Sequence, residues 1–591
     1  MRIAVLLKDR CKPKNCSYEC IKYCPRVRAG DETITKTPDG GVVISEGLCV
    51  GCGICVHKCP FEAIKIIGLA EALESDLVHQ FGVNGFRLFR LPSLKKGVCV
   101  GILGPNGIGK TTTVRILSGQ LKPNLGCLDK EPSWDDVLSY YSGTELYEHF
   151  KSLSEGKIKS VVKPQYVDKI PKVTKGRIKD VLKRADTSDS FDIIVEKLGL
   201  ENTLNKNIED GTISGGELQL VSIAATLLKD ADLYFFDEPS SYLDIYQRLK
   251  VSRLIQELSK KKKVLVVEHD LAVLDFLCEQ VHLVYGEEGA YGVITHPRGV
   301  RQGINTYLSG YLKEENIKFG ERIEFFAHPP KRRQDLNILI SFGRLTKKFN
   351  EDFTINIESG VIRQGEIIGV VGPNAIGKTT FVNILAGVIK PDTGVIEYNL
   401  KISYKPQYIS IDHKGTVRSY LEEKAQLLFT EPFYISEIYE PLHLKYLLDK
   451  DIDTLSGGEL QRVSIACALV QDADIYLIDE PSAYLDSEQR MIASRTIRRV
   501  IEKTGKSALV VDHDVYFIDM VSDALMVFTG EPGKYGTAEG PFSLHEGMNR
   551  FLKTVDITFR RDEDTKRPRV NKPDSYLDRQ QRMHGEYYYD I

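Results

Sequence analysis

The sequence GPNGIGKTT at residues 104–112 recurs almost unchanged as GPNAIGKTT at residues 372–380. Each copy has the spacing of a phosphate-binding loop, in which backbone N–H groups of a Gly-rich turn surround the phosphates of a nucleotide. The lysine would contact the β- and γ-phosphate oxygens, and the threonine after it would ligate Mg2+. The predicted contacts are Gly104, Asn106, Gly107, Gly109, Lys110, Thr111 and Thr112 in the first loop, and Gly372, Asn374, Gly377, Lys378, Thr379 and Thr380 in the second.

The repeat extends beyond these loops. The strings that return are KPQY at 163–166 and 405–408, SGGEL at 214–218 and 456–460, and DEP at 237–239 and 479–481. The glutamine of KPQY lies 49 residues before the serine of SGGEL in both copies. We therefore expect a duplicated domain in which both copies are complete.

One segment breaks this symmetry. The interval from the loop lysine to the KPQY glutamine is 55 residues in the first copy and 29 in the second, so the first copy has about 26 extra residues here. The insertion falls within roughly residues 127–155 and indicates two short amphipathic helices with Ser133 and Thr144 as N-caps. Surface decoration is the alternative, because long loop insertions cost little free energy.

The repeat also continues behind the DEP motifs. A duplicated segment without catalytic residues suggests a structural element, and we interpret it as a hinge where the two halves pack. The matching residues are Tyr291, Pro297, Gly303 and Asn305 in the first copy, and Tyr535, Pro541, Gly547 and Asn549 in the second.

Each half carries the acidic and imidazole groups that nucleotide hydrolysis needs. An apolar strand ends in Asp237-Glu238 in the first copy and in Asp479-Glu480 in the second. The aspartate should position Mg2+, and the glutamate should polarise the attacking water. The SGGEL sequence opens a helix whose N-terminus can receive the γ-phosphate of a facing domain. The histidines placed to reach the γ-phosphate end are His269 and His513.

Eight of the twelve cysteines lie between residues 11 and 59. The second group of four has the CxxCxxCxxxCP spacing of bacterial-type ferredoxins, and the first group is a looser version. The fourth cysteine of such a run normally ligates the cluster of the other run. The expected ligands are Cys11, Cys16, Cys20 and Cys59 for one 4Fe-4S cluster, and Cys49, Cys52, Cys55 and Cys24 for the other. We expect the remaining cysteines to be buried thiols, namely Cys99, Cys127, Cys278 and Cys467.

Disulfides and zinc are the alternatives for the eight N-terminal cysteines. The N-terminus does not resemble a signal peptide, and the rest of the chain looks like an intracellular ATPase, in which thiols stay reduced. Zinc sites prefer two CxxC pairs separated by a longer loop. Both alternatives fit the pattern less well than iron–sulfur clusters do.

Length and charge limit the function classes. The 591 residues suffice for about four domains, and a net charge of −3 does not suit a generic polyanion binder. Residues 1–30 contain eight Lys or Arg and two acidic residues, which suits either nucleic acid binding or compensation for anionic clusters. No stretch approaches roughly 18 uninterrupted apolar residues, so we expect no membrane span, and a transporter would need a separate membrane subunit.

Taken together, the motifs resemble those of the ABC ATPase superfamily. The resemblance implies a head-to-tail sandwich with two composite ATP sites. The first site would join Lys110, Gln165, Asp237, Glu238 and His269 to Ser456, Gly457, Gly458 and Glu459. The second would join Lys378, Gln407, Asp479, Glu480 and His513 to Ser214, Gly215, Gly216 and Glu217. The catalytic residues would be Glu238, Glu480, His269 and His513, and the magnesium ligands would be Thr111, Gln165, Thr379 and Gln407.

In this superfamily an aromatic residue ahead of the loop stacks on adenine. Phe81 and Phe349 each lie 29 residues before their loop lysine. We therefore expect these two residues, rather than Phe86 and Phe353, to contact the base.

Over nearly its whole length the sequence resembles the class E ABC family, also called the RNase L inhibitor family. The resemblance rests on the cysteines, the twin ATPase halves, the insertion, and the strings KPQYVDKIP at 163–171, DEPSSYLD at 237–244 and VEHD at 267–270. It implies ATP-driven splitting of ribosomes after termination or rescue, with a peptide release factor or its stalled-ribosome paralogue. We expect a cytoplasmic monomer that binds the ribosome, mainly its small subunit and rRNA. An ATP-gated iron–sulfur electron-transfer protein and a transporter ATPase subunit are the alternatives.

The expected fold class is α/β, with two ABC-type P-loop ATPase domains head to tail behind a ferredoxin-like α+β iron–sulfur domain. The expected boundaries are 1–75 for the iron–sulfur domain, 76–290 for the first ATPase domain, 291–335 for a hinge segment, 336–534 for the second ATPase domain, and 535–591 for a second hinge segment and tail.

Two positions depart from the family pattern. Leu220 follows the first signature where Arg462 follows the second, which predicts unequal turnover at the two sites. Ala375 replaces a loop glycine, which we expect to be tolerated if the position needs no positive φ.

Overall fold

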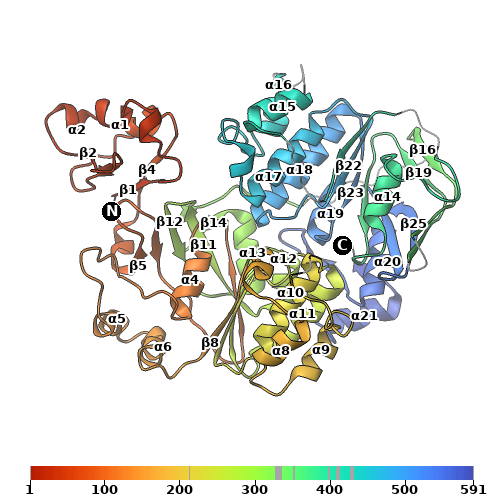
Figure 1. Ribbon diagram of the computed structural model, residues 1–591, viewed down its shortest axis with the longest axis horizontal. Coiled ribbons are helices and arrows are strands. Elements are labelled where there is room, and N and C mark those ends of the chain that lie inside the picture. The colour runs from red at the N-terminus through yellow and green to blue at the C-terminus, as the bar shows by residue number, and fades with distance from the viewer. Residues whose placement is uncertain are drawn as a thin grey trace.

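The chain folds into an N-terminal domain followed by two α/β halves that face one another (Figure 1). The computed structural model describes residues 2–209, 211, 213–325, 336–349, 353–396, 400–407, 413–425 and 431–589. The end of the expected hinge segment at 291–335 lies outside the described residues, as do residues 590 and 591. Within the described ranges, no helix combines the length and the apolar character that a bilayer span requires.

The N-terminal domain has short elements and a small core. Strand β1 (Arg2–Leu6) pairs antiparallel with β4 (Ile64–Gly68), and β2 (Ile34–Lys36) pairs with β3 (Val42–Ile44). Several cysteine side chains belong to the core itself. A domain of this size with so little apolar surface to bury needs a further stabilising group. The helices are α1 (Glu19–Lys22), α2 (Pro25–Arg28) and α3 (Ile54–Lys58).

Asn84, which follows the first strand of the first half, holds the N-terminal domain in place. Its buried side chain accepts from the N–H of Ile44 at 2.8 Å and donates to the carbonyl oxygens of Ala4 and Ile44 at 3.0 Å. Arg87 donates to both carboxylate oxygens of Glu46 at 2.9 Å. The first half therefore binds strands from both small sheets of the N-terminal domain.

The first half is built on a sheet in the order β5-β6-β12-β11-β7-β10-β9-β8, with β13 beside β11. Along β9 the side chains alternate between faces, so that Phe235 packs against α4 and Phe236 packs against α10. All of β9 is buried because helices cover both faces. The strands are β5 (Leu77–Gln80), β6 (Arg87–Phe89), β7 (Cys99–Leu103), β8 (Ser160–Lys163), β9 (Leu233–Asp237), β10 (Lys263–Val267), β11 (Gln280–Glu287), β12 (Tyr291–Ile294) and β13 (Arg298–Gly299). The helices are α4 (Lys110–Leu117), α7 (Ile170–Val173), α8 (Ile178–Ala185), α9 (Phe191–Leu198), α10 (Gly215–Leu227), α11 (Ile245–Ser259) and α12 (Leu271–Leu277).

The second half repeats this plan in the order β17-β18-β25-β24-β20-β23-β22-β21. One apolar core contains Tyr234 of the first half and Tyr476 of the second, so the halves are joined by continuous packing. The strands are β16 (Ile338–Phe342), β17 (Leu345–Phe349), β18 (Phe353–Ile357), β19 (Gly360–Arg363), β20 (Ile367–Val371), β21 (Ile402–Lys405), β22 (Ile475–Asp479), β23 (Ser507–Val511), β24 (Ala524–Glu531) and β25 (Tyr535–Ser543). The helices are α14 (Lys378–Leu385), α15 (Val417–Ala425), α16 (Pro432–Tyr434), α17 (Gly457–Leu469), α18 (Ser487–Thr504) and α19 (Val515–Val521).

The insertion in the first half forms α5 (Trp134–Tyr140) and α6 (Glu145–Ser154), at the lower left of Figure 1. Ser133 caps α5 through a reciprocal pair of hydrogen bonds with Asp136. Thr144 stands at the N-cap position of α6, but its hydroxyl accepts no hydrogen bond from the helix and instead donates to the carbonyl of Tyr141 at 2.7 Å. Phe150 is 0% exposed and stacks on the Tyr141 ring, so it belongs to the core of the first half.

The duplicated tail begins later than the sequence suggested. Strand β12 pairs with β6 and β11, and β25 pairs with β18 and β24, so boundaries at 291 and 535 cut through the two main sheets. The shared glycines have a packing role. A Cβ on Gly303 would lie 2.1 Å from Val281 Cγ1, and one on Gly547 would lie 2.5 Å from Leu525 Cβ. Each glycine therefore lets a helix lie directly on a strand, in α13 (Val300–Ser309) and α20 (Leu544–Val555).

The C-terminal segment bridges the two halves through buried ion pairs. Arg567 is 0% exposed and donates to Asp275 of α12 at 3.0 Å and to the hydroxyl of Tyr516 of α19 at 2.8 Å. Arg569 donates to both carboxylate oxygens of Asp275, at 2.9 and 3.1 Å. Burial would raise the pKa of Asp275, but the two guanidinium groups outweigh it and lower that pKa. The elements of this segment are β26 (Phe559–Arg561), β27 (Pro568–Val570), α21 (Tyr576–His584) and β28 (Tyr588–Tyr589).

Replacing Arg567 with methionine should lower the free energy of unfolding by about 1–3 kcal/mol, because it leaves Asp275 with Arg569 as its remaining guanidinium partner and removes a buried donor to the Tyr516 hydroxyl. Arg550→Met is the matched control, since Arg550 pairs with Glu546 at the surface and such pairs are worth less than about 1 kcal/mol. Urea denaturation curves followed by circular dichroism measure both. Equal midpoints for the two variants would contradict a structural role for the buried network.

Candidate functional site

The two halves meet head to tail at their phosphate-binding loops. The N–H of Asn106 donates to Asp486 of the second half at 3.1 Å, and the N–H of Asn374 donates to Asp244 of the first half at 2.8 Å. The hydroxyl of Ser487 also donates across the interface, to the carbonyl of His269 at 2.6 Å. A cavity of 2120 Å3 runs between the halves and is lined by both loops and both SGGEL sequences. The structure therefore brings together the residues of the two predicted composite sites.

Each loop lysine begins the helix behind its loop and points back into the loop. Lys110 donates to the carbonyl oxygens of Gly104 at 2.8 Å and Pro105 at 2.5 Å, and Lys378 makes the same pair of bonds in the second copy. Burial lowers the pKa of each lysine to about 8. An anion bound at the N-terminus of α4 or α14 would favour the charged form of the lysine. The positive end of the helix dipole would also attract this anion.

Ala375 has a φ of 54°, in the left-handed region, where its counterpart Gly107 has 72°. We expected the alanine to be tolerated if this position needs no positive φ. That condition is not met, because the position does have a positive φ. A non-glycine residue there stores about 1–2 kcal/mol of backbone strain.

Oxygen ligands suited to Mg2+ converge at the carboxyl ends of β9 and β22. The hydroxyl of Thr111 donates to Asp237 at 3.3 Å, and that of Thr379 donates to Asp479 at 2.8 Å. Burial, and then the neighbouring glutamate, raise the pKa of each aspartate to about 6. A hard divalent cation prefers oxygen donors of this kind and would favour the ionised carboxylates. The residues present therefore fit magnesium.

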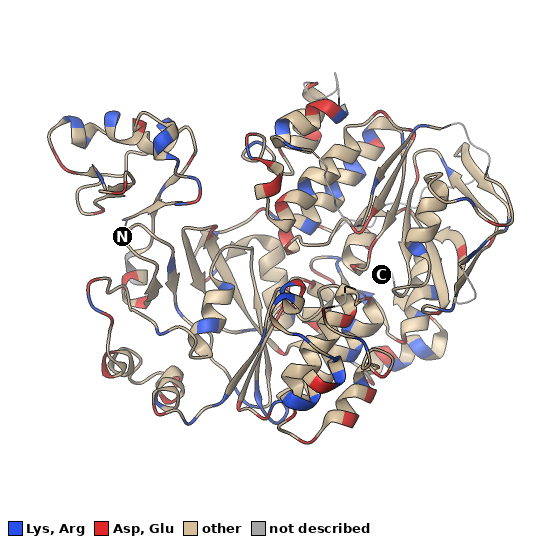
Figure 2. Cartoon of the chain, viewed as in Figure 1, with Lys and Arg blue, Asp and Glu red and all other residues tan. Residues whose placement is uncertain are grey.

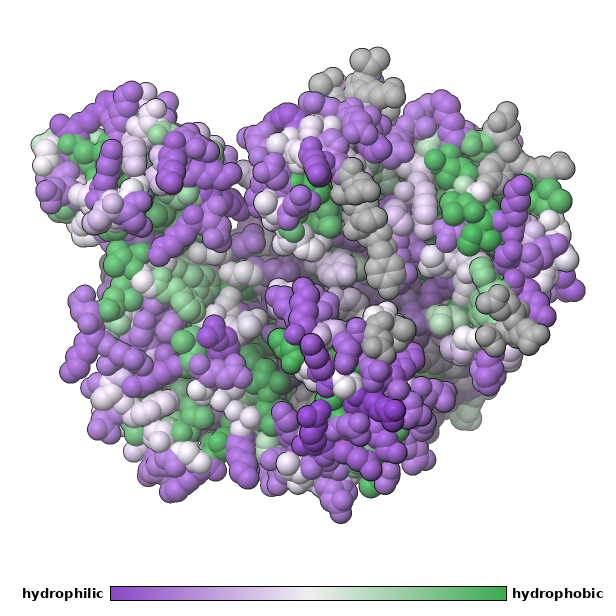
Figure 3. All heavy atoms as spheres, in the orientation of Figure 1, coloured by the Kyte–Doolittle hydropathy of each residue, from purple (hydrophilic) through white to green (hydrophobic). Residues whose placement is uncertain are grey.

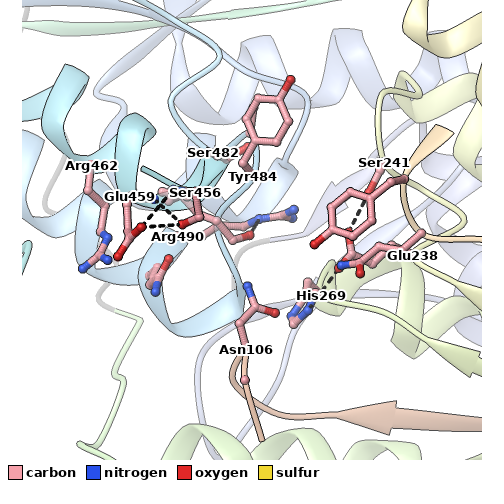
Figure 4. Close-up of a pocket in the computed structure, with 18 of the residues that line it drawn as sticks. Asn106, Glu238, Ser241, His269, Ser456, Glu459, Arg462, Ser482, Tyr484 and Arg490 are labelled. Carbon is pink, nitrogen blue, oxygen red and sulfur yellow. Dashed lines mark hydrogen bonds and ion pairs between the residues drawn. The ribbon is translucent and has the colours of Figure 1, made fainter. Parts of the chain in front are cut away.

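A glutamine and a histidine contact each glutamate that follows these aspartates. The side-chain amide of Gln165 donates to Glu238 at 2.7 Å, and that of Gln407 donates to Glu480 at 2.8 Å. His269 Nε2 lies 3.6 Å from Glu238 Oε1, and burial lowers its pKa well below the ordinary value, so its imidazole is neutral near pH 7. Figure 4 shows this pair beside Asn106, facing the helix that begins at Ser456.

The SGGEL sequences form the first turns of α10 and α17. Ser214 and Ser456 are the N-caps, each in a reciprocal hydrogen-bond pair with the glutamate three residues on. A Cβ on Gly458 would lie 3.0 Å from the carbonyl oxygen of Tyr484, so a side chain there would push the helix start from its neighbour. These helix N-termini point N–H groups into the cavity and suit a phosphate.

Two further differences distinguish the sites. Arg462 lines the cavity and donates to the carbonyl of Leu442 at 3.0 Å, whereas Leu220 is buried in the core. The hydroxyl of Ser241 donates to Glu238 at 3.1 Å, and Ala483 occupies the matching position beside Glu480. The second difference was missed at the level of sequence, although it is visible in the repeated strings DEPSSYLD and DEPSAYLD.

The aromatic side chains occupy different places in the two halves. Phe81 and Phe86 both line the cavity, with their ring centroids 6.4 Å apart. In the second half Phe353 lines the cavity, whereas Phe349 is not among the described residues of its wall. Phe349 lies behind Phe353, with 6.3 Å between ring centroids.

The eight N-terminal cysteines fall into two groups in space. Cys59, Cys16 and Cys11 lie close enough to Cys20 to add to the burial that raises its pKa, and Cys49, Cys52 and Cys24 do the same for Cys55. Burial is the larger cause, and it raises the pKa of Cys20 to about 11 and that of Cys55 to about 12. The raised pKa values show that the thiolate form is unfavourable without a positive charge nearby. A bound cation would stabilise the thiolates, so these thiols suit a site that binds cations.

In the described part of the chain, no set of three or more His, Cys, Asp or Glu side chains is placed to hold a single metal ion. All twelve cysteines are described and all are free thiols. A multi-atom iron–sulfur cluster bound by four thiolates fits this donor set. Of the four remaining cysteines, Cys127 is exposed, so the expectation that it is buried was wrong.

Known protein families match the N-terminal domain and part of each α/β half. The ABC transporter family matches residues 92–241 and 356–483. Residues 1–32 match the family described as a possible Fer4-like domain in RNase L inhibitor, RLI. Residues 42–65 match the 4Fe-4S binding domain family. The translation initiation factor RLI1 of Saccharomyces cerevisiae is 44% identical over 599 residues, which cover 100% of this chain and 98% of that protein.

Solved structures are similar over most of the chain. A model of ribosome-bound archaeal Pelota and ABCE1 has a TM-score of 0.94 and 52% identity, and the match covers 100% of this chain and 99% of that chain. The crystal structure of the complex of archaeal ribosomal stalk protein aP1 and archaeal ribosome recycling factor aABCE1 has a TM-score of 0.83 and 54% identity, covering 88% of this chain and 100% of that chain.

Replacing Glu238 or Glu480 with glutamine should slow hydrolysis at the altered site by about 100-fold, because the amide cannot polarise water as a carboxylate does. The two single variants should differ in overall ATP turnover, since Ser241 and Arg462 each act at one site only. Steady-state phosphate release measures both, with the double variant as background. Indistinguishable rates for the single variants would show that the two sites are equivalent.

Proposed function

The chain belongs to the class E ABC family, also called the RNase L inhibitor family, and on that premise we propose that it is an ATP-driven ribosome recycling factor. Its ATPase domains and iron–sulfur domain are those of the family. The observation that carries the proposal is the cross-half contact at each phosphate-binding loop, made by Asp244 and Asp486. Such contacts make ATP occupancy and the relative position of the halves depend on each other.

Hydrolysis would use the same groups at both sites. The loop lysine holds the phosphates, and the SGGEL helix of the opposite half receives the γ-phosphate at its N-terminus. Glu238 or Glu480 polarises the attacking water, and the neutral His269 or its counterpart His513 contacts the γ-phosphate end. Bound magnesium would neutralise phosphate charge, held by Thr111 and Gln165 at one site and by Thr379 and Gln407 at the other.

The cysteines would bind two 4Fe-4S clusters with crossed ligands. The grouping of Cys59 with the first run and of Cys24 with the second supports this assignment. Such clusters would supply the stiffness that the small core of the N-terminal domain lacks. For adenine, Phe81 remains our candidate in the first half, and the cavity wall favours Phe353 over Phe349 in the second.

Closing both sites on ATP would rotate one half against the other, which is a domain-closure switch. The N-terminal domain is bound to the first half through Asn84, and Arg10 lies over the Tyr446 ring of the second half, 6.0 Å from its centroid. Figure 3 shows this domain as a separate lobe at the upper left. A rotation of the halves would therefore move the lobe relative to the second half.

The proposed partners follow from the names of the relatives and from charge. One similar structure is of ribosome-bound archaeal Pelota and ABCE1, and another contains an archaeal ribosomal stalk protein. We propose the ribosome, mainly its small subunit and rRNA, with a release factor or its stalled-ribosome paralogue, and a monomer acting in the cytoplasm. The N-terminal domain contains many Lys and Arg residues, coloured blue in Figure 2, and their positive charge suits RNA phosphates.

Adding the protein with ATP and a release factor should convert ribosomes of the source organism into subunits. The Glu238→Gln, Glu480→Gln double variant should bind ribosomes and stay bound, because its sites close without hydrolysing ATP. Sucrose-gradient sedimentation measures both results, and ADP in place of ATP is the control. Intact ribosomes with the wild-type protein would contradict the function. ATP-dependent reduction of an electron acceptor would favour the electron-transfer alternative.

Replacing Cys24 with serine should remove the cluster that Cys49, Cys52 and Cys55 would share, so iron content should fall by about half. Iron quantification and Mössbauer spectroscopy of anaerobically purified protein measure the loss. Cys127→Ser is the matched control, because Cys127 lies outside both groups and should leave iron unchanged. Loss confined to the cluster of Cys11, Cys16 and Cys20 would show that the ligands are not crossed.

A further inference from the structure

The lysine of each KPQY string is buried without an evident role in ATP binding. Lys163 is 0% exposed and Lys405 is 1% exposed. They end β8 and β21, beside the strands that lead to the acidic pairs, with Lys163 opposite Phe236 and Lys405 opposite Ile478. Burying an ammonium group is costly, so its hydrogen bonds indicate what it is for.

Both lysines donate to main-chain carbonyls of the acidic pair. Lys163 Nζ lies 3.0 Å from the carbonyl oxygen of Asp237 and 3.2 Å from that of Glu238. Lys405 Nζ lies 2.7 Å from the carbonyl oxygen of Asp479 and 3.4 Å from that of Glu480. The same contacts thus occur twice, in halves that have diverged elsewhere.

The backbone that these lysines hold is strained. Glu238 has a φ of 49° and Glu480 a φ of 47°, in the left-handed region that glutamate rarely adopts. Each such residue costs about 1–3 kcal/mol and persists only where its surroundings enforce it. A second buried donor assists, since Gln219 and Gln461 donate to the same glutamate carbonyls at 2.8 and 2.7 Å.

The segment that follows the lysine carries the glutamine that contacts the carboxylate. Gln165 follows Lys163 by two residues and donates to Glu238 Oε1 at 2.7 Å. The lysine therefore fixes the main chain of the glutamate, and the glutamine fixes its side chain. If the hydrogen bond from the lysine to the main chain were lost, the carboxylate of the glutamate would point in a different direction in the cavity.

We propose that Lys163 and Lys405 are positioning residues for ATP hydrolysis, each holding the following strand's glutamate in the left-handed conformation that points its carboxylate at the attacking water. The inference rests on the proposed catalytic role of Glu238 and Glu480. It assigns a function to the lysine of KPQY that is separate from phosphate binding by Lys110 and Lys378.

The test uses the full chain with one site silenced. In the Glu480→Gln background, where the first site alone turns over, Lys163→Met should lower kcat by about 10- to 100-fold, as a misplaced catalytic group does. The KM for ATP should change by less than about threefold, because the phosphate contacts remain. Lys159→Met is the matched control, since Lys159 is exposed near the start of the same strand and should leave kcat unchanged.

A double-mutant cycle separates positioning from general structural damage. If Lys163 acts through Glu238, adding Lys163→Met to the Glu238→Gln, Glu480→Gln double variant should lower its residual rate by less than about twofold. An equal loss in both backgrounds would overturn the proposal. A normal kcat for Lys163→Met would also overturn the proposal, provided that Glu238→Gln abolishes turnover of the same site. If Glu238→Gln itself has no effect, the catalytic assignment fails first.

Should Lys163→Met not fold, Lys405→Met in the Glu238→Gln background provides the same test at the second site. A crystal structure of the folded variant adds a direct readout. We expect the glutamate φ to leave the left-handed region while the loop lysine and the magnesium ligands stay in place. An unchanged φ of about 50° would contradict the proposed constraint.

Discussion

Two aspartate side chains hold the halves of this protein together at the point where ATP would bind. Asp244 accepts from the N–H of Gln247 through one carboxylate oxygen, which caps α11, and from the N–H of Asn374 of the opposite loop through the other. Asp486 caps α18 and binds Asn106 in the same way. Each phosphate-binding loop is thus tied to a helix of the other half, and a shift of either half must alter both sites.

The rest of the structure connects this interface to the outer parts of the molecule. On one side, Arg567 and Asp275 join the C-terminal segment to both halves through buried charges that cannot easily separate. On the other side, Asn84 binds the N-terminal domain to the first half. If the halves moved at the ATP sites, they would therefore rotate about the fixed C-terminal contact. This rotation would displace the iron–sulfur domain at the opposite end of the molecule.

The sequence predicted what repeats and spacings encode, namely two α/β halves, the insertion and the groups that line the cavity. It failed where the outcome depends on contacts between distant segments. The residue type at position 375, an alanine, does not indicate the positive φ that the structure shows there. Strand β12 joins the main sheet because β6 and β11 lie beside it, which local sequence does not reveal. The lysine of KPQY was visible as a repeat, but its hydrogen bonds to Glu238 appear only once β8 and β9 are paired.

The most direct test of this arrangement is a structure of the Glu238→Gln, Glu480→Gln variant with ATP and magnesium, determined by crystallography or electron cryo-microscopy. We predict that each γ-phosphate contacts the lysine of one half and the SGGEL helix N-terminus of the other, with Asp244 and Asp486 still bound to the opposite loops. Nucleotides held by a single half, with the SGGEL helices turned away from them, would contradict the composite sites and the proposed coupling between ATP and domain movement.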